Sequence, residues 1–481
     1  MSTITFSLIS HTNVGKTSLA RTLLRREIGE VSDQAHVTDK NEVHPLIETA
    51  AHSLVLWDTP GFGDSARLLK RLRGQGSPLA WLQSQLWDRI VDRPLYCSQQ
   101  AVINVREEAD LVLYLVSAAE SPEDAGYVPL EMELLSWTEV PVVILLNQTG
   151  ENAGEDLEPI ARAWRTASRA WPAVRAVLPL DAHRRSWVEE GVLLEESAAW
   201  IDPRHTDALT ELTAAWHARG RSIVDRSVAS LATFLSELLH HRESFEGSTF
   251  SPGAKRAAQE KIITVVEKRT RALLAEWIAI HELTGALAEE VESDWGEFVD
   301  SGEVWLDGKK LGLGGALGGA ATGALVDAKT LGLTMGAGTM IGGILGGIAG
   351  WGLGGWISEK STKGRHLRIG GDAIEALLER LLVGLCVITH HGRGRGEVRP
   401  EGWAARWIEQ VDGALAPQLS TLSQIWGEGK QRDGDPQRTA KELEGPLNRV
   451  ALDLLAADGE RIAETVSRIE KARATAGRVT P

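Results

Sequence analysis

The chain has 481 residues and a formal net charge of −15, with 43% hydrophobic and 24% charged residues. This composition excludes a disordered protein, and the length predicts about three compact units. The negative charge disfavours a general nucleic-acid-binding protein, because such proteins need lysine and arginine to replace phosphate counterions. The cysteines Cys97 and Cys386 lie far apart in the sequence. They exclude a disulfide framework and favour a reducing cytoplasm. The first residues also lack a basic and apolar leader, so we expect no secretory signal.

Short apolar runs rich in β-branched residues alternate with amphipathic stretches over residues 1–195. The runs are nearly continuous, which is typical of parallel strands buried on both faces of a sheet. Because helical stretches lie between them, we predict a doubly wound α/β domain. The predicted strands are Thr3–Ile9, Ser53–Trp57, Leu111–Val116, Val142–Leu146 and Val174–Leu180.

The first predicted strand leads into a motif close to GxxxxGK[ST]. Such a loop curls backbone N–H groups around phosphates, directs its lysine to the β- and γ-phosphates and places a hydroxyl on Mg²⁺. Lys16 and Thr17 fit these two roles, and the dipole of the helix that begins near Lys16 adds to them. Ser10 replaces the first glycine, which a negative φ permits. The predicted phosphate-binding residues are Ser10, His11, Thr12, Asn13, Val14, Gly15, Lys16, Thr17 and Ser18.

A second motif, Asp58-Thr59-Pro60-Gly61, follows the predicted strand Ser53–Trp57. A carboxylate at the carboxyl end of a parallel strand can hold Mg²⁺ through water, and the Gly61 N–H would contact the γ-phosphate. The position after a phosphate loop makes this otherwise common pattern specific. We therefore predict Thr17 and Asp58 as metal ligands, and Lys16 and Gly61 as catalytic groups.

Together, Asn13–Ser18 and Asp58–Gly61 resemble the Era/EngA/TrmE branch of translation-factor-related GTPases. The resemblance implies a P-loop G domain that binds and hydrolyses GTP with Mg²⁺. Val37-Thr38-Asp39 resembles the switch I of that branch, which implies Thr38 as a catalytic, Mg²⁺-sensing residue. The whole chain resembles bacterial proteins that join such a domain to a helical C-terminal domain of unknown function with a glycine-rich apolar segment.

The base-recognition motif departs from this resemblance. Where N/TKxD is expected, the chain has Asn147-Gln148-Thr149-Gly150, so the aspartate that accepts two hydrogen bonds from guanine is missing. Losing a bidentate charged contact should lower guanine selectivity, unless Glu151 or Asn152 replaces it. GTP is favoured over ATP by the fold and by Asn147. The predicted base contacts are Asn147, Gln148, Asp181 and Ala182.

Phe62 stands where Ras-type switches place a water-orienting glutamine, which implies slow intrinsic hydrolysis. In relatives of this branch, an asparagine at the position of Asn13 binds K⁺, which supplies positive charge when the G domains dimerise. The resemblance thus implies K⁺ at Asn13, as a catalytic aid, and a homodimer through the G domain. In the alternative interpretation, Asn13 only shapes the loop.

Two further regions are predicted to be helical. In residues 196–310, apolar residues recur at helical spacing, as expected of ordinary core-facing stripes. Residues 358–481 return to amphipathic helices, which are interrupted by a glycine- and arginine-rich loop that starts at His390-His391. Adjacent histidines on a helix point about 100° apart, so they chelate metal poorly.

Between these regions, residues 311–357 are dominated by glycine and alanine, with one glycine every four residues from Gly338 to Gly354. On a helix this period makes a smooth ridge, a glycine zipper, that lets another backbone approach closely. Lysines, arginines and tryptophans flank the segment, which fits a hairpin that enters a membrane from the cytoplasmic face. The alternative is a helical hairpin packed inside a soluble domain or an oligomer interface.

The combined prediction is an α/β G domain, with a mostly parallel sheet, followed by an all-α domain with a glycine-zipper hairpin. It would act as a cytoplasmic GTP switch at the inner face of the membrane, with a membrane or membrane protein as partner. Two other functions stay open: a dynamin-like membrane-remodelling GTPase, and a nucleotide-binding scaffold with negligible turnover. Phe62 and the altered base motif favour the scaffold.

Overall fold

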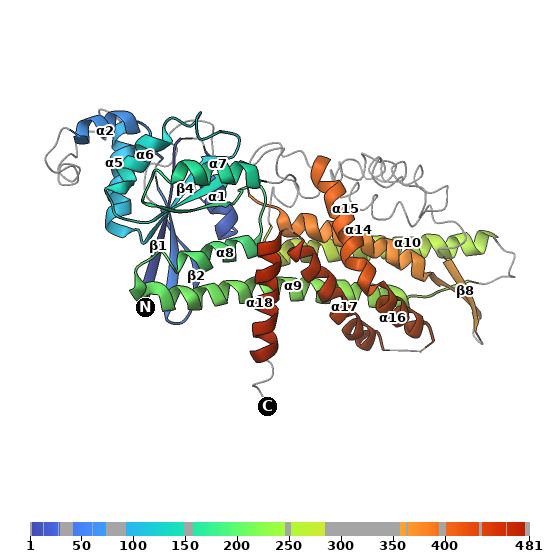
Figure 1. The fold of residues 1–481 in the computed structure, drawn as a ribbon. Coiled ribbons are helices and arrows are strands. Elements are labelled where there is room, and N and C mark those ends of the chain that lie inside the picture. Colours follow the sequence, from blue (N-terminus) through green and yellow to red (C-terminus); the bar gives the residue numbers. More distant parts are fainter. Residues whose placement is uncertain are drawn as a thin grey trace. The chain divides into compact units, whose positions relative to one another are not determined.

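The computed structural model divides the chain into two compact units (Figure 1). Unit 1 holds Met1–Gly220 and His390–Arg399, and unit 2 holds Arg221–Thr389 and Pro400–Pro481. The predicted site residues Asn13 and Thr38, the position Gly150 where the base-binding aspartate is missing, and residues 311–355 of the glycine-rich segment lie outside the described residues. The structure describes residues 2–12, 14–26, 28, 42–59, 61–73, 93–148, 157–245, 252–283, 356–361, 364–393, 401–431, 435–457 and 459–476.

Unit 1 contains a six-stranded sheet with the order β2-β3-β1-β4-β5-β6, in which only the edge strand β2 is antiparallel to its neighbour. The five predicted strands are confirmed, and β2 was not predicted. Pro45 interrupts β2, and its side chains are mostly half-buried or exposed, so it lacks the continuous apolar run of a central strand. The strands are β1 (Ser2–Ser10), β2 (Glu42–Glu48), β3 (His52–Asp58), β4 (Leu111–Ser117), β5 (Val142–Asn147) and β6 (Val174–Pro179).

Helices cover both faces of this sheet. Along β4, Leu113 packs in one core cluster and Val112 and Tyr114 pack in the other, as the two-residue period of a strand requires. Burial of both side-chain sets explains why the central strands are apolar throughout. The helices of this domain are α1 (Lys16–Leu24), α2 (Ser65–Arg73), α5 (Arg93–Glu108), α6 (Val128–Ser136), α7 (Glu158–Ser168) and α8 (Trp187–Ser197).

The core of unit 1 extends beyond the predicted domain end at residue 195. Leu193 of α8 packs in the same cluster as Ile4 of β1, and so do Leu212 and Trp216 of α9 (Thr206–His240). A cut at residue 195 would therefore expose side chains that the sheet buries. The unit consequently runs to Gly220 and also includes the segment that begins at His390.

Unit 2 is mainly helical, and the predicted apolar stripe of α10 (Pro252–Ile280) is confirmed, because Ile262, Val266 and Trp277 are fully buried. The expectation of an all-α region is wrong at one place, a three-stranded antiparallel sheet with the order β7-β9-β8. Its strands are too short to give a clear two-residue period, and β8 begins at Trp356, inside the predicted hairpin. The elements are β7 (Glu243–Phe245), β8 (Trp356–Ser361), β9 (Gly364–Ile369), α14 (Gly371–His390), α15 (Glu401–Leu415), α16 (Leu419–Gln431), α17 (Pro436–Ala456) and α18 (Glu460–Ala476).

Within the described ranges, no helix is both long enough and apolar enough to cross a bilayer.

Candidate functional site

The phosphate loop lies between the end of β1 at Ser10 and the start of α1 at Lys16, at the carboxyl edge of the sheet. Gly15 caps α1 in the left-handed region, with φ 85° and ψ 25°. A Cβ atom at Gly15 would also stand 2.7 Å from the Asn147 Nδ2 atom. The loop therefore requires glycine at this position, for its backbone conformation and for space.

Three predicted residues meet at this loop. The Lys16 Nζ donates to the Asp58 Oδ1 at 2.6 Å, and the Thr17 Oγ1 donates to the Asp58 Oδ2 at 2.9 Å. Lys16 is 8% exposed and Asp58 is 2% exposed, so the charges interact in a largely water-excluded place. β3 positions the carboxylate beside β1, with which it pairs in parallel. The structure thus brings together the lysine, the hydroxyl and the acid that the two motifs predict.

The oxygen atoms of Thr17 and Asp58 are suitable ligands for Mg²⁺. A hydroxyl and a carboxylate are hard donors, and Mg²⁺ is commonly bound by one or two carboxylates together with substrate phosphates and waters. The residues that the structure describes include no group of three or more histidine, cysteine, aspartate or glutamate side chains that could hold a metal. Because one hydroxyl and one carboxylate leave most ligand positions of Mg²⁺ open, the pair fits a cation that nucleotide phosphates share with the protein.

The loop after β3 is joined to the phosphate loop through its backbone. The Phe62 N–H donates to the Ser10 carbonyl at 2.9 Å, and a Cβ at Gly61 would stand 3.1 Å from the same carbonyl oxygen. Ser10 is not among the residues with positive φ, so a serine fits the position of the missing glycine. Phe62 is fully buried in the core beside Ile9 and Leu68. Its ring serves packing, so it supplies no group that orients water.

On the base side, Asn147 connects two loops. Its side chain is fully buried; the Nδ2 donates to the Val14 carbonyl at 2.7 Å, and the Oδ1 accepts from the Ala182 N–H at 2.8 Å. Both polar atoms of the amide are thus engaged in holding the loop after β6 against the phosphate loop. The predicted neighbour Asp181 accepts from the His183 N–H at 2.9 Å, and Gln148 has a left-handed φ of 55°.

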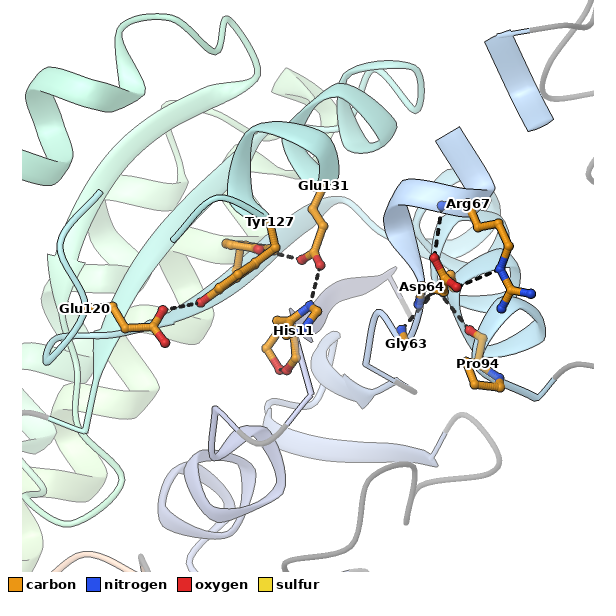
Figure 2. A network of polar contacts seen from close by, with 11 residues as sticks. His11, Gly63, Asp64, Arg67, Pro94, Glu120, Tyr127 and Glu131 are labelled. Atoms are coloured by element: carbon orange, nitrogen blue, oxygen red, sulfur yellow. Dashed lines mark hydrogen bonds and ion pairs between the residues drawn. The ribbon is translucent and has the colours of Figure 1, made fainter. Parts of the chain in front are cut away.

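A polar network around the buried Glu131, which includes the phosphate-loop residue His11, was not predicted (Figure 2). The His11 Nδ1 lies 2.7 Å from the Glu131 Oε1, and the Tyr114 hydroxyl donates to the Glu131 Oε2 at 2.5 Å. The His11 ring stacks on Tyr127 with 4.4 Å between ring centroids, and the Tyr127 hydroxyl donates to Glu120 at 2.7 Å. A phosphate-loop side chain is thereby tied to helix α6.

Glu131 is fully buried, and burial raises the pKa of its carboxyl, while hydrogen bonds from His11, Tyr114 and Ser65 act in the opposite direction. The hydrogen bond to Glu131 raises the pKa of His11. Ser65 is the first residue of α2, the helix that follows the motif Asp58–Gly61. The Glu131 carboxylate therefore contacts both the phosphate loop and this helix. One feature of the sequence could have revealed this network: Glu131 lies among the apolar residues of α6, at a position that faces the core.

The start of α2 is also held by helix α5 (Figure 2). The backbone N–H groups of Gly63 and Asp64 both donate to the Ser98 Oγ at 3.0 Å, and this Oγ donates to the Pro94 carbonyl at 3.1 Å. The Asp64 side chain accepts from the Arg67 Nε at 2.7 Å. The segment after Gly61 is therefore positioned by a serine hydroxyl more than thirty residues away in the sequence.

The chain matches two protein families. Residues 5–148 match the family described as 50S ribosome-binding GTPase, and residues 170–443, more than half of the chain, match the Domain of unknown function (DUF3482). The GTPase Era of Leuconostoc citreum (strain KM20) is 24% identical over 204 residues, which cover 42% of this chain and 57% of that protein. The chain thus spans little more than half the length of this curated relative.

Solved structures of Era are similar to the same part of the chain. An Aquifex aeolicus Era variant bound to GDP·AlF4− has a TM-score of 0.31 at 17% identity, covering 42% of this chain and 58% of its own. An Era in complex with MgGDPNP and part of 16S ribosomal RNA has a TM-score of 0.28 at 17% identity, covering 38% and 51%. The two family matches and the curated relative, taken together, show an Era-like GTPase domain at the N-terminus, and the chain belongs to the family described as Domain of unknown function (DUF3482).

Proposed function

We propose that the protein binds GTP with Mg²⁺ and hydrolyses it slowly, as a molecular switch. The observation that carries this proposal is the contact of the buried Lys16 and Asp58 with each other and with the half-buried Thr17, at the carboxyl edge of the sheet. Lys16 would leave the carboxylate for the β- and γ-phosphates, Thr17 and Asp58 would hold Mg²⁺, and the Gly61 N–H would contact the γ-phosphate. Thr38, outside the described residues, is proposed as the metal-sensing threonine.

Binding is tested by identifying the nucleotide that copurifies with the full chain and by titrating GTP, GDP and ATP with Mg²⁺. We expect GTP and GDP to bind more tightly than ATP. Equal affinity for GTP and ATP would contradict the guanine assignment, and no binding of either would overturn the proposed function.

Slow turnover is proposed because Phe62 is fully buried. On the resemblance alone, we propose that a K⁺ ion at Asn13 supplies the missing positive charge when two G domains form a homodimer. Phosphate release should be faster in potassium than in sodium chloride, and Asn13→Ala should remove the difference. Binding without phosphate release over hours in either salt would favour the nucleotide-binding scaffold.

Membrane association through residues 311–357, at the inner face of the cytoplasmic membrane, is a separate proposal. Its support is the apolar, glycine-rich sequence with Lys309 and Lys310 before it. Leucine at Gly342, Gly346 and Gly350 should lower the melting temperature if the glycines pack against another helix. Liposome flotation of the wild type tests association itself, and its absence would contradict the proposal. GTP-dependent assembly on the liposomes would favour the dynamin-like alternative.

A further inference from the structure

The loop after β6 is held by a segment far away in the sequence, His390–Arg393, which begins at the last residue of helix α14. The Arg185 N–H donates to the His390 carbonyl at 2.9 Å, and the Gly392 N–H donates to the His183 carbonyl at 3.0 Å. Arg184 and His391 form an antiparallel bridge between these two bonds. All these residues belong to unit 1, so the segment is part of the compact unit that contains the G domain.

Helix α1 joins the same contact through one hydroxyl. The Thr22 Oγ1 donates to the Ala182 carbonyl at 2.7 Å and accepts from the Arg393 N–H at 2.7 Å. Thr22 is 2% exposed. A buried hydroxyl that both donates and accepts ties the loop after β6, the segment His390–Arg393 and α1 together.

Gly392 allows the two backbones to approach this closely. A Cβ at this position would stand 2.1 Å from the Ala182 carbonyl oxygen and 2.6 Å from the His183 carbonyl carbon. Both neighbours are backbone atoms, which cannot turn aside as a long side chain can. Burial, together with His183 and Arg393, lowers the pKa of His391 to about 4, so this imidazole is neutral at physiological pH.

One residue, Ala182, connects this contact to the candidate nucleotide site. Ala182, whose carbonyl oxygen lies beside Gly392 and Thr22, donates its N–H to Asn147, which in turn holds the Val14 carbonyl of the phosphate loop. Asp181 and Ala182 are two of the four residues predicted to contact the base. The match to the Domain of unknown function (DUF3482), residues 170–443, includes both this loop and His390–Arg393, whereas the GTPase match ends at residue 148.

We propose that His390–Arg393 is a positioning element of the nucleotide site, which holds the Asp181-Ala182 loop in its base-binding conformation. This inference rests on the proposed nucleotide binding. The base side of the site is then completed by a segment from much later in the chain that belongs to the same unit. Lys16, Thr17 and Asp58 contact one another directly, so we expect the phosphate side to be affected less than the base side.

Full-length Gly392→Ala tests the proposal, with Gly413→Ala as its matched control, because nothing lies within 4 Å of a Cβ added at Gly413. Thr22→Val removes the shared hydroxyl without adding bulk, and Thr22→Ser retains it. Two quantities are measured: the affinity and dissociation rate of a fluorescent GDP, and hydrogen–deuterium exchange of residues 180–185 in nucleotide-free protein. Melting temperatures establish that each variant is folded.

We expect Gly392→Ala and Thr22→Val to weaken GDP at least tenfold, mainly through faster dissociation, and to speed exchange at residues 180–185. The KM for GTP should rise while kcat at saturation stays within about twofold. Gly413→Ala and Thr22→Ser should resemble the wild type. Wild-type exchange and affinity in both Gly392→Ala and Thr22→Val would overturn the inference, and so would faster exchange with unchanged affinity. If the wild type bound no guanine nucleotide, the proposed function would fail, while the exchange data would still report whether the segment holds the loop.

Discussion

The phosphate side and the base side of the candidate site are built in different ways. On the phosphate side, charged and hydroxyl side chains from helix α1 and strand β3 contact each other directly. On the base side, one buried amide and several backbone groups hold together three loops that are far apart in the sequence. Contacts between charged side chains hold the phosphate side together, whereas backbone hydrogen bonds hold the base side together. A substitution on the base side should therefore act by moving a loop and not by removing a charge.

Lys16→Ala should have the largest effect. It removes the ammonium group that we propose contacts the β- and γ-phosphates, and we expect GTP and GDP affinity to fall about 100-fold or more, roughly 2.7 kcal/mol. Titration calorimetry with Mg²⁺ measures the loss, and Lys441→Ala in α17, an exposed lysine, is the matched control. A loss below about tenfold would refute the phosphate-loop assignment. Because the variant leaves the Asp58 carboxylate without its ammonium partner, melting must be recorded alongside binding.

Thr17→Ala and Asp58→Ala should each lower Mg²⁺-dependent GTP affinity about tenfold or more. Since both side chains act on one ion and hydrogen-bond to each other, the double variant should be little worse than the more severe single one. The combination of Thr17→Ala with the exposed Thr166→Ala provides an additive comparison. Full additivity of Thr17→Ala and Asp58→Ala would argue against a shared metal.

Asn147→Ala tests the connection between the two regions. It leaves the Val14 carbonyl and the Ala182 N–H without their buried partner, which costs roughly 1–3 kcal/mol of stability for each unsatisfied group. We expect GDP to bind several-fold more weakly, with faster dissociation. Asn147→Asp keeps the acceptor for Ala182 but turns a buried carboxylate oxygen toward the Val14 carbonyl oxygen, so it should weaken binding at least as much as alanine. An unchanged melting temperature and an unchanged GDP dissociation rate would show that Asn147 does not couple the phosphate side to the base side.

The smallest effect concerns the polar network around Glu131. Folding raises the pKa of His11 above its ordinary 6.5, so its contact with Glu131 stabilises the protein fully below pH 6.5 and is lost as pH rises through the raised pKa. Folding also raises the pKa of Glu131, so its contribution to stability likewise falls as the pH rises above 4.5. The difference in Tm between wild type and Glu131→Gln should thus be larger at pH 6 than at pH 9, by a few degrees.

The control for this pH dependence is Glu133→Gln on the same helix. Glu133 pairs with Arg73, which lowers the pKa of its carboxyl, so its contribution is lost only as pH falls below 4.5. Its difference from the wild type should be constant between pH 6 and pH 9. An equal slope in both variants would remove the His11–Glu131 contact as the cause.

The same contrast explains what could be predicted from the sequence. Lys16, Thr17 and Asp58 were predicted because their motifs are short and follow strands whose apolar runs are continuous. Strand β2 was not predicted, because it contains Pro45 and its mostly half-buried or exposed residues form no continuous apolar run. The role of Asn147 as a bridge was missed because the amide is satisfied by backbone groups, which leave no pattern in the residue types. Gly392 was visible only as one glycine in a glycine-rich loop.

Full burial of Phe62 also limits how hydrolysis could be accelerated by engineering. A Phe62→Gln substitution copies the residue of fast switches, yet the side chain at this position points into the core and its N–H is committed to Ser10. The new amide would lose aromatic packing and would be buried without partners, at roughly 1–3 kcal/mol for the desolvated group. It would therefore weaken the fold before it could reach a water molecule. In this scaffold a gain of rate has to come from a group brought in from outside the position, by a second chain, a cation or a regulator.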